Sequence, residues 1–412
     1  MTAIPQTGFR KTSEAESAYA WVRLFTALAI STLGSVGMWS VVVALPAVQA
    51  EFAVARADAS LPFTLAMIGF GVGAVALGRL ADRFGILASI LCGAAALCAG
   101  YIGASLAPNL WVFALASFLS GFGTSVTFAP LIADLSHWFT RRRGIAVTIV
   151  AAGNYLGGAV WPPIVQHFID ASGWRATHFG IGLFCLATMT PLAFVLLRRV
   201  ATHTHEAEGA AAAGELARLG ISPNALMALI CAAGVGCCVA MSMPQVHIVA
   251  YCGDLGYGVA RGAEMLSLML GFGIISRLAS GFLADRIGGV ATLLIGSFLQ
   301  GVALVLYLLF DGLVSLYVIS ALFGLFQGGI VPMYAIIIRQ YFPPREAGTR
   351  VGIAIFATIL GMAWGGWVSG WIFDLTGSYR AAFLNGLAWN LVNISVMTWL
   401  LLRARQARLA VA

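Results

Sequence analysis

The stretch "GFGIISRLASGFLADRIG", residues 271–288, ends in a motif that occurs twice in the chain. The earlier copy, "GRLADRFG" at residues 78–85, precedes "GFLADRIG" at residues 281–288 by 203 positions. The apolar part of the later stretch contains a charged residue, Arg277, which the same offset matches with Ala74. A duplicated chain therefore carries a charge in one half that the other half lacks.

The composition indicates a protein surrounded by lipid. Of the 412 residues, 60% are hydrophobic and 9% are charged, and the mean hydropathy is +0.92. A soluble protein carries about 25% charged residues, whereas a spanning helix needs about 20 apolar residues in a row. Twelve segments meet that length and are too continuously apolar for barrel strands: 22–47, 60–80, 86–106, 110–137, 144–168, 176–198, 224–252, 262–284, 290–310, 313–338, 349–373 and 381–402.

Two further landmarks repeat in the same order as the paired motifs. Phe139 of "SHWFTRRRG" matches Phe342 of "RQYFPPREAG" at the same offset, and "DASGWR" (170–175) corresponds to "DLTGSYR" (374–380). We therefore predict an all-α membrane protein with twelve transmembrane helices in two six-helix bundles, an arrangement suited to alternating access. The predicted divisions are a cytoplasmic tail at 1–21, bundles at 22–198 and 224–402, a cytoplasmic linker at 199–223 and a cytoplasmic tail at 403–412.

The basic residues predict which side of the membrane each loop occupies. With the N-terminus inside, eighteen Lys and Arg residues fall on the inner side and four on the outer side, with Arg277 left within a helix. Positive residues are retained in the cytoplasm during insertion, so we expect both termini there and the chain in the inner (plasma) membrane. The net charge of +7 is therefore a topology signal and does not indicate a nucleic-acid partner. The seven cysteines have no metal-ligand spacing, and we expect neither a metal nor a cofactor.

The paired loops resemble the signature loop of the major facilitator superfamily, and the resemblance covers residues 20–403. Within that superfamily, "GMWSVVVALPAVQAEF" (37–52), "WFTRRRGIAVTIVAAGNYLGGAVWPP" (138–163) and the sub-motif R-x-x-x-G-x-L-A-D resemble the monocarboxylate and oxalate/formate branch. The resemblance implies a secondary active transporter and not an enzyme.

The resemblance also implies that these loops latch one half to the other in the outward-facing state. An aspartate such as Asp82 suits the positive N-terminus of a neighbouring helix, here the one that starts near Arg350, and the glycines permit a tight turn. Asp134 resembles the family's charge-relay acid and would pair with Arg83. The alternative is that these residues only shape the turn and set topology. The latch residues are Gly78, Asp82, Arg83, Gly85, Asp134, Gly281, Asp285, Arg286 and Gly288.

Arg277 is the main candidate for binding substrate. An arginine within a spanning helix usually faces a cavity or a partner, and its planar guanidinium matches a carboxylate. In the branch that the chain resembles, an arginine at this helix-eight position binds the substrate carboxylate. Animal-type carriers also have an acid one turn earlier, where this chain has Gly273, and the second cation of the oxalate type is missing. One buried cation favours one carboxylate; the alternatives are a structural contact or a snorkelling side chain.

Other polar residues in the spans are weaker candidates for the site. Pro244 predicts a break in the seventh helix that exposes its neighbours, and Gln327 and Tyr334 are seven residues apart on one helix face. For each residue the alternative is ordinary helix packing. The substrate-binding candidates besides Arg277 are Asn154, Tyr155, Gln245, His247, Gln327, Tyr334 and Trp364.

We therefore predict a monomeric secondary transporter that moves a small organic anion, most simply a monocarboxylate, through the lipid bilayer. Its drive is the substrate gradient, protons or exchange. The alternative is a proton-coupled drug exporter of the same fold, but such exporters resemble one another in a G-P-x-x-G-G stretch that "GNYLGGAVWPP" (153–163) does not match. An intramembrane enzyme is disfavoured because no H-E-x-x-H, G-x-S-x-G or nucleotide-binding glycine loop is present.

Overall fold

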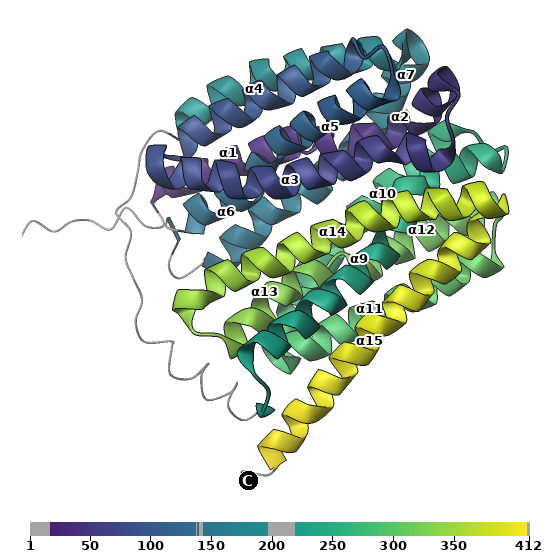
Figure 1. Cartoon of the computed structure of the whole chain (residues 1–412). Coiled ribbons are helices and arrows are strands. Elements are labelled where there is room, and N and C mark those ends of the chain that lie inside the picture. The colour runs from purple at the N-terminus through teal and green to yellow at the C-terminus, as the bar shows by residue number, and fades with distance from the viewer. Residues whose placement is uncertain (1–16, 137, 140–142, 197–218, 410–412) are drawn as a thin grey trace, which may run out of the picture.

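A computed structural model describes residues 17–136, 138–139, 143–196 and 219–409, and its secondary structure is helical (Figure 1). Most of the predicted N-terminal tail and of the predicted linker lie outside these residues. The elements are α1 (Ala18–Gly34), α2 (Val36–Phe52), α3 (Arg56–Phe84), α4 (Ile86–Ser105), α5 (Leu110–Thr124), the 3-10 turn η1 (Ser125–Thr127), α6 (Ala129–Ser136), α7 (Arg143–Val195), α9 (Pro223–Asp254), α10 (Val259–Ile287), α11 (Gly289–Leu309), α12 (Leu313–Gln327), α13 (Ile330–Tyr341), α14 (Pro344–Thr376) and α15 (Tyr379–Leu409).

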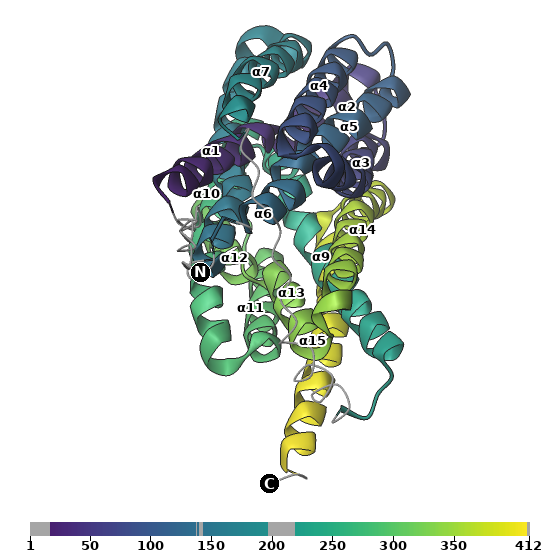
Figure 2. The ribbon, with the colours of Figure 1, turned by 90° about the vertical axis from the view of Figure 1, so that its left-hand side faces the viewer.

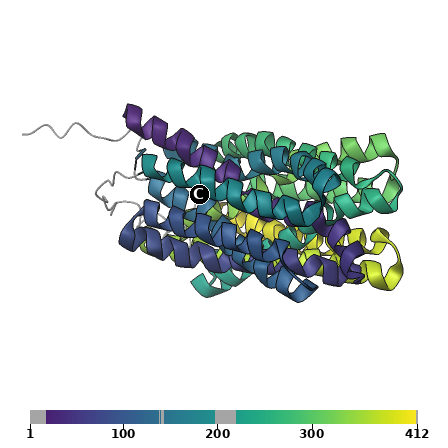
Figure 3. The same cartoon turned by 90° about the horizontal axis from the view of Figure 1, so that it is seen from above.

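The described helices account for twelve membrane crossings, as predicted. Eleven helical stretches are long and apolar enough to span a bilayer, and one of them, Ala146–Val195, has 50 residues. That stretch bends at Gly173, whose φ of 78° and ψ of 159° are open only to glycine. The two parts of α7 on either side of Gly173 are therefore the fifth and sixth crossings. The long helices all follow the same general axis (Figure 3).

The two halves repeat each other in detail. A Cβ on Gly121 of α5 would overlap the backbone of Ala66 on α3, and a Cβ on Gly324 of α12 would overlap the backbone of Met269 on α10. Both members of the second pair lie 203 positions after those of the first. The fourth and tenth crossings are also interrupted at equivalent places, by η1 in the first half and by the α12–α13 junction in the second. Small residues at these crossings let helix backbones touch.

The predicted break at Pro244 is wrong, because α9 runs unbroken through all 32 residues from Pro223 to Asp254. Every residue from Gly236 to Ala250 is buried among other helices. Neighbouring helices can support the backbone around an intramembrane proline, so the missing N–H does not force a break here.

The halves meet along two pairs of long helices, α3 with α14 and α7 with α10 (Figures 1 and 2). We call the end of the molecule where α7 stops and α9 starts the linker end, and the opposite end the distal end. Near the distal end the halves approach so closely that a Cβ on Gly370 would lie only 2.9 Å from the backbone of Arg56 and 3.0 Å from that of Ala57, closer than an ordinary van der Waals contact. At the linker end the charged side chains of the paired motifs are exposed. The halves are thus joined most closely at their distal end.

Candidate functional site

Arg277 lies on α10 where this helix crosses α7, and its side chain joins the two halves. Its Nε donates to the carbonyl oxygen of Gly328 at 3.3 Å, and its Nη1 donates to the carbonyl oxygen of Ala151 at 2.9 Å. The residue is 7% exposed. Within the described part of the chain, no carboxylate pairs with it. A buried guanidinium therefore lies between the halves, and none of the described residues gives it a counter-charge.

The ring of Tyr155 is the closest aromatic partner of this cation. The guanidinium carbon of Arg277 lies 4.1 Å from the ring centroid, which is a cation–π arrangement. The ring also rests against Gly273, where an added Cβ would overlap ring atoms. Gly273, the position at which animal-type carriers have an acid, is thus the residue that allows Tyr155 to reach Arg277.

Two buried donors near this stack have no hydrogen-bond partner in the described residues. Gln327 is fully buried; its Oε1 lies 3.5 Å from the Tyr155 hydroxyl, a long contact, and its Nε2 has no partner. The indole Nε1 of Trp39 on α2 likewise has none, and it packs at Gly158, one turn along α7 from Tyr155. The surroundings of Arg277 therefore contain more donors than acceptors.

The sequence did not point to Trp39, although the first crossing, which α1 and α2 form together, carries a usable signal. Ser31 and Ser35 pack against Gly153 and Gly157 of α7. Trp39 follows them at the next four-residue step, on the same helix face. A face of small residues that ends in a tryptophan marks the side of this crossing that meets α7.

Three of the other predicted residues are buried outside the stack. Asn154 is buried on α7, but it points about 100° around the helix from Tyr155. Gln245 is buried on α9. Tyr334 is fully buried inside the second half, where its hydroxyl donates to Asn393 Oδ1 at 3.2 Å. In this conformation the hydroxyl of Tyr334 is thus directed to Asn393, within its own half.

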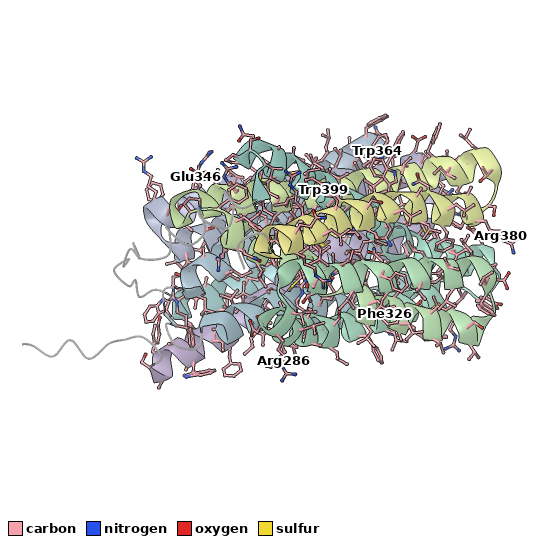
Figure 4. All side chains as sticks on the ribbon, turned by 90° about the horizontal axis from the view of Figure 1, so that it is seen from below. Arg286, Phe326, Glu346, Trp364, Arg380 and Trp399 are labelled. Atoms are coloured by element: carbon pink, nitrogen blue, oxygen red, sulfur yellow. The ribbon has the colours of Figure 1, made fainter. Side chains whose placement is uncertain are left out.

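Trp364 is a correction to the predicted site. Its side chain is 49% exposed and projects from the outside of α14, at the edge of the molecule (Figure 4). It contacts Trp367 of the same helix, with ring centroids 5.4 Å apart. Residues three apart on a helix share a face, so this face carries aromatic side chains and does not point to Arg277.

His247 lies near the distal end, in a polar cluster between the halves. Its Nε2 is 2.8 Å from the carbonyl oxygen of Gly366, and its Nδ1 is 3.1 Å from the hydroxyl of Tyr379. Because a carbonyl only accepts, Nε2 carries the proton and Nδ1 accepts from the tyrosine. The Tyr379 hydroxyl in turn accepts from Nη1 of Arg56 at 2.9 Å. His247 is thus hydrogen-bonded on both nitrogens, apart from the Arg277 group.

The predicted latch residues lie at the linker end and share an exposed setting. Asp82, Arg83, Asp285 and Arg286 have exposed side chains, and Figure 4 shows Arg286 projecting from the surface. Added Cβ atoms on Gly78 and Gly281 would meet no atom within 4 Å. Gly85 and Gly288 end their helices with φ of 91° and 85°, the conformation that requires glycine. The turn geometry explains these two glycines, and the latch stays a prediction about another conformation.

Asp134 pairs with Arg23 in this conformation. Two oxygens of Asp134 lie 2.7 Å from Nη2 of Arg23, and Oδ2 also accepts from Nε at 3.0 Å. The arginine side chain is 1% exposed and lies over the ring of Trp138 at 4.7 Å. The first helix therefore supplies the partner of Asp134 in this conformation, whereas the sequence predicts Arg83.

The chemistry of the central group suits an anion. Arg277 has five N–H donors, of which two are used by the carbonyls of Gly328 and Ala151. The other N–H groups of the guanidinium can donate to the two oxygens of a carboxylate. Among the described residues, no cluster of His, Cys, Asp or Glu could hold a metal ion.

Comparison with known proteins places these features in a family. The model described as Major Facilitator Superfamily matches residues 27–319 and 265–411. Monocarboxylate transporter 13 of Bos taurus is 27% identical over 346 residues, which cover 82% of this chain and 78% of that protein. Monocarboxylate transporter 11 of Homo sapiens is 27% identical over 384 residues, 90% of this chain and 80% of that protein. Agnestins efflux protein AgnL12 of Paecilomyces divaricatus is 23% identical over 324 residues, 78% of this chain and 72% of that protein.

The fold is also found among solved structures. A bacterial homolog of the human lysosomal transporter Spinster, in an inward-facing and occupied conformation, matches with a TM-score of 0.68. The match covers 96% of this chain and 97% of that structure at 13% identity, so it shows a shared fold.

Proposed function

This chain belongs to the major facilitator superfamily of membrane transporters, and we propose that its substrate is a small organic anion with a single carboxylate. The observation that carries this assignment is the buried Arg277, which has no carboxylate partner among the described residues. Relatives named monocarboxylate transporters support the same substrate class.

An unpaired charge inside a membrane protein is costly, and a bound anion removes that cost. Breaking a buried ion pair by removing one partner destabilises a protein by about 3–5 kcal/mol. The transporter without substrate resembles that broken pair, because carbonyl oxygens and the Tyr155 ring only partly replace a counter-charge. A carboxylate bound to Arg277 supplies it. Because Arg277 is the single cation among the described residues of the site, a substrate with one carboxylate balances its charge best.

The contacts of Arg277 also connect binding to movement of the halves. Its guanidinium touches Ala151 and Tyr155 on α7 of the first half, while Arg277 and Gly328 belong to the second half. A carboxylate bound there is held between two bodies that separate and close during alternating access. We assign residues 22–198 and 224–402 to these bodies, with the linker end in the cytoplasm of a plasma-membrane protein. The closed distal end then makes this conformation inward-facing.

Export of a larger organic compound is the second candidate. The similarity to a fungal efflux protein favours it, as does the missing acid at residue 273, which departs from the animal-type pattern. Under this alternative Arg277 would be a structural link between α10 and α7.

Thermal unfolding of the purified transporter with a panel of ligands separates the two candidates. The panel holds mono-, di- and aromatic carboxylates and cationic drugs, tested on wild type, Arg277→Ala and the control Arg380→Ala. Arg380 is an exposed arginine at the distal end (Figure 4). A ligand at 100 times its Kd stabilises the native state by about 2.7 kcal/mol.

We expect monocarboxylates to raise the unfolding midpoint of wild type and of Arg380→Ala, and to have no effect on Arg277→Ala. Equal stabilisation of a folded Arg277→Ala protein would remove Arg277 as the anchor. Stabilisation by cationic drugs alone would favour the exporter.

A further inference from the structure

The N-terminus of α3 receives no side-chain cap from the described residues of its own half. The first N–H groups of a helix need acceptors outside the helix, and Ser, Thr, Asp or Asn at the preceding position usually supplies one. Here that position is Ala55, which has no side-chain hydrogen bond to offer.

The missing cap comes from the other half of the molecule. Oδ1 of Asp374, near the end of α14, accepts from the backbone N–H of Arg56 at 2.8 Å, and Oδ2 accepts from the N–H of Ala57 at 2.7 Å. A carboxylate in this position also complements the positive end of the helix dipole. Helix α3 therefore depends on a residue 318 positions away in the sequence.

The side chain of Arg56 binds the same face of the second half. Its Nη2 lies 3.0 Å from Oδ1 of Asp254 at the end of α9, and its Nη1 donates to Tyr379 at the start of α15. Its guanidinium carbon lies 4.9 Å from the ring centroid of Phe373 on α14. One residue of the first half thus contacts three helices of the second, and its side chain is only 8% exposed.

None of these contacts can persist if the distal ends of the halves move apart. On the premise of the proposed alternating-access function, we propose that Asp374 and Arg56 form a distal latch that holds the distal end closed. In opening, α3 loses its cap at the same time as Arg56 loses Asp254 and Tyr379. The latch sets the fraction of molecules that open distally, and it acts by positioning α3 without touching the substrate.

The matching residue of the first half provides a control. Asp170 of "DASGWR" corresponds to Asp374 of "DLTGSYR", but its Oδ1 accepts from Nε2 of Gln166, one turn earlier on the same helix. This hydrogen bond stays within one half, so its loss leaves the contact between the halves unchanged.

A cysteine placed behind the latch reports opening. Ser60, one turn along α3 from Arg56, is fully buried and follows it on the same helix face. Ser60→Cys is introduced together with Cys92→Ser and Cys231→Ser, which remove the native cysteines of the described residues that are not buried. The rate of modification by a bulky hydrophilic maleimide is then measured on the purified transporter in lipid nanodiscs, without substrate.

We expect Asp374→Ala to raise this rate about fivefold, the ratio that corresponds to about 1 kcal/mol for a lost cap. Asp374→Asn keeps one acceptor oxygen and should give a smaller increase, and Asp170→Ala should match the parent. An unchanged rate in folded Asp374→Ala and Asp374→Asn proteins would overturn the latch. If Asp374→Ala does not fold, the modification rates of Asp374→Asn and Arg56→Gln test the latch in its place. The assay contains no substrate. Its result therefore tests the distal latch whether or not the substrate is a carboxylate.

Discussion

The ring of Tyr155 occupies the space that any side chain at Gly273 would need. The same ring faces the guanidinium of Arg277, so a glycine on α10 and an aromatic residue on α7 together define the surroundings of the buried cation. An acid at residue 273, as in animal-type carriers, is sterically incompatible with this stack. Under the proposed function, the substrate carboxylate then supplies the counter-charge of this cation.

Gly273→Ala should weaken carboxylate binding about tenfold, because the new methyl group displaces Tyr155 and a desolvated cation–π contact contributes about 1–2 kcal/mol. Isothermal titration or ligand-dependent thermal shifts measure the change. Gly271→Ala is the matched control on the same helix, since its added Cβ would lie at an ordinary 3.7 Å from Ala159. Equal behaviour of the two variants would count against the stack.

Tyr155→Phe should keep carboxylate affinity within about twofold, whereas Tyr155→Leu should lower it about tenfold. Phenylalanine keeps the ring over Arg277 and loses the hydroxyl, with its long 3.5 Å contact to Gln327 and its interaction with the guanidinium. Leucine fills part of the space but has no ring quadrupole. Affinity measured for both variants with one monocarboxylate checks the order, and a large loss in Tyr155→Phe would instead assign the role to the hydroxyl.

Asp134→Asn should destabilise the transporter by about 3 kcal/mol, because it removes the carboxylate charge that pairs with the buried guanidinium of Arg23. The midpoint of thermal unfolding in detergent measures the loss. Glu51→Gln is the control: its pair with Arg175 is exposed on both sides, and such pairs contribute less than about 1 kcal/mol. A midpoint unchanged in Asp134→Asn would show that the pair is not a stabilising one.

Gly324→Ala should destabilise by about 2 kcal/mol, since its Cβ overlaps the backbone of Met269 and α10 and α12 must move apart. The repeat predicts a similar loss for Gly121→Ala in the first half. Gly352→Ala on α14 is the contrasting change, because an added Cβ there meets no atom within 4 Å and alanine favours a helix. Unfolding midpoints of the three variants should separate accordingly.

The sequence by itself determined the twelve crossings, the duplication at an offset of 203 and the unusual charge at Arg277. Each of these features depends only on local composition or on spacing along the chain. A membrane-spanning helix is recognised from about 20 consecutive apolar residues. A repeat is recognised from two similar stretches of sequence. The glycines that end α3 and α10 were predictable for the same reason, because a turn that needs positive φ selects glycine locally.

Only the tertiary structure decided which polar side chains meet. Arg277 binds the carbonyl of a residue 126 positions earlier, and Asp134 pairs with an arginine 111 positions away. Asp374 caps a helix in the other half, although its own stretch is merely a repeat landmark in the sequence. Apolar helices of similar length can pack together in many rotations and registers. The hydropathy of the sequence does not distinguish between these arrangements. Close contacts at small residues such as Gly273 select one arrangement, and that selection exists only once the helices are packed.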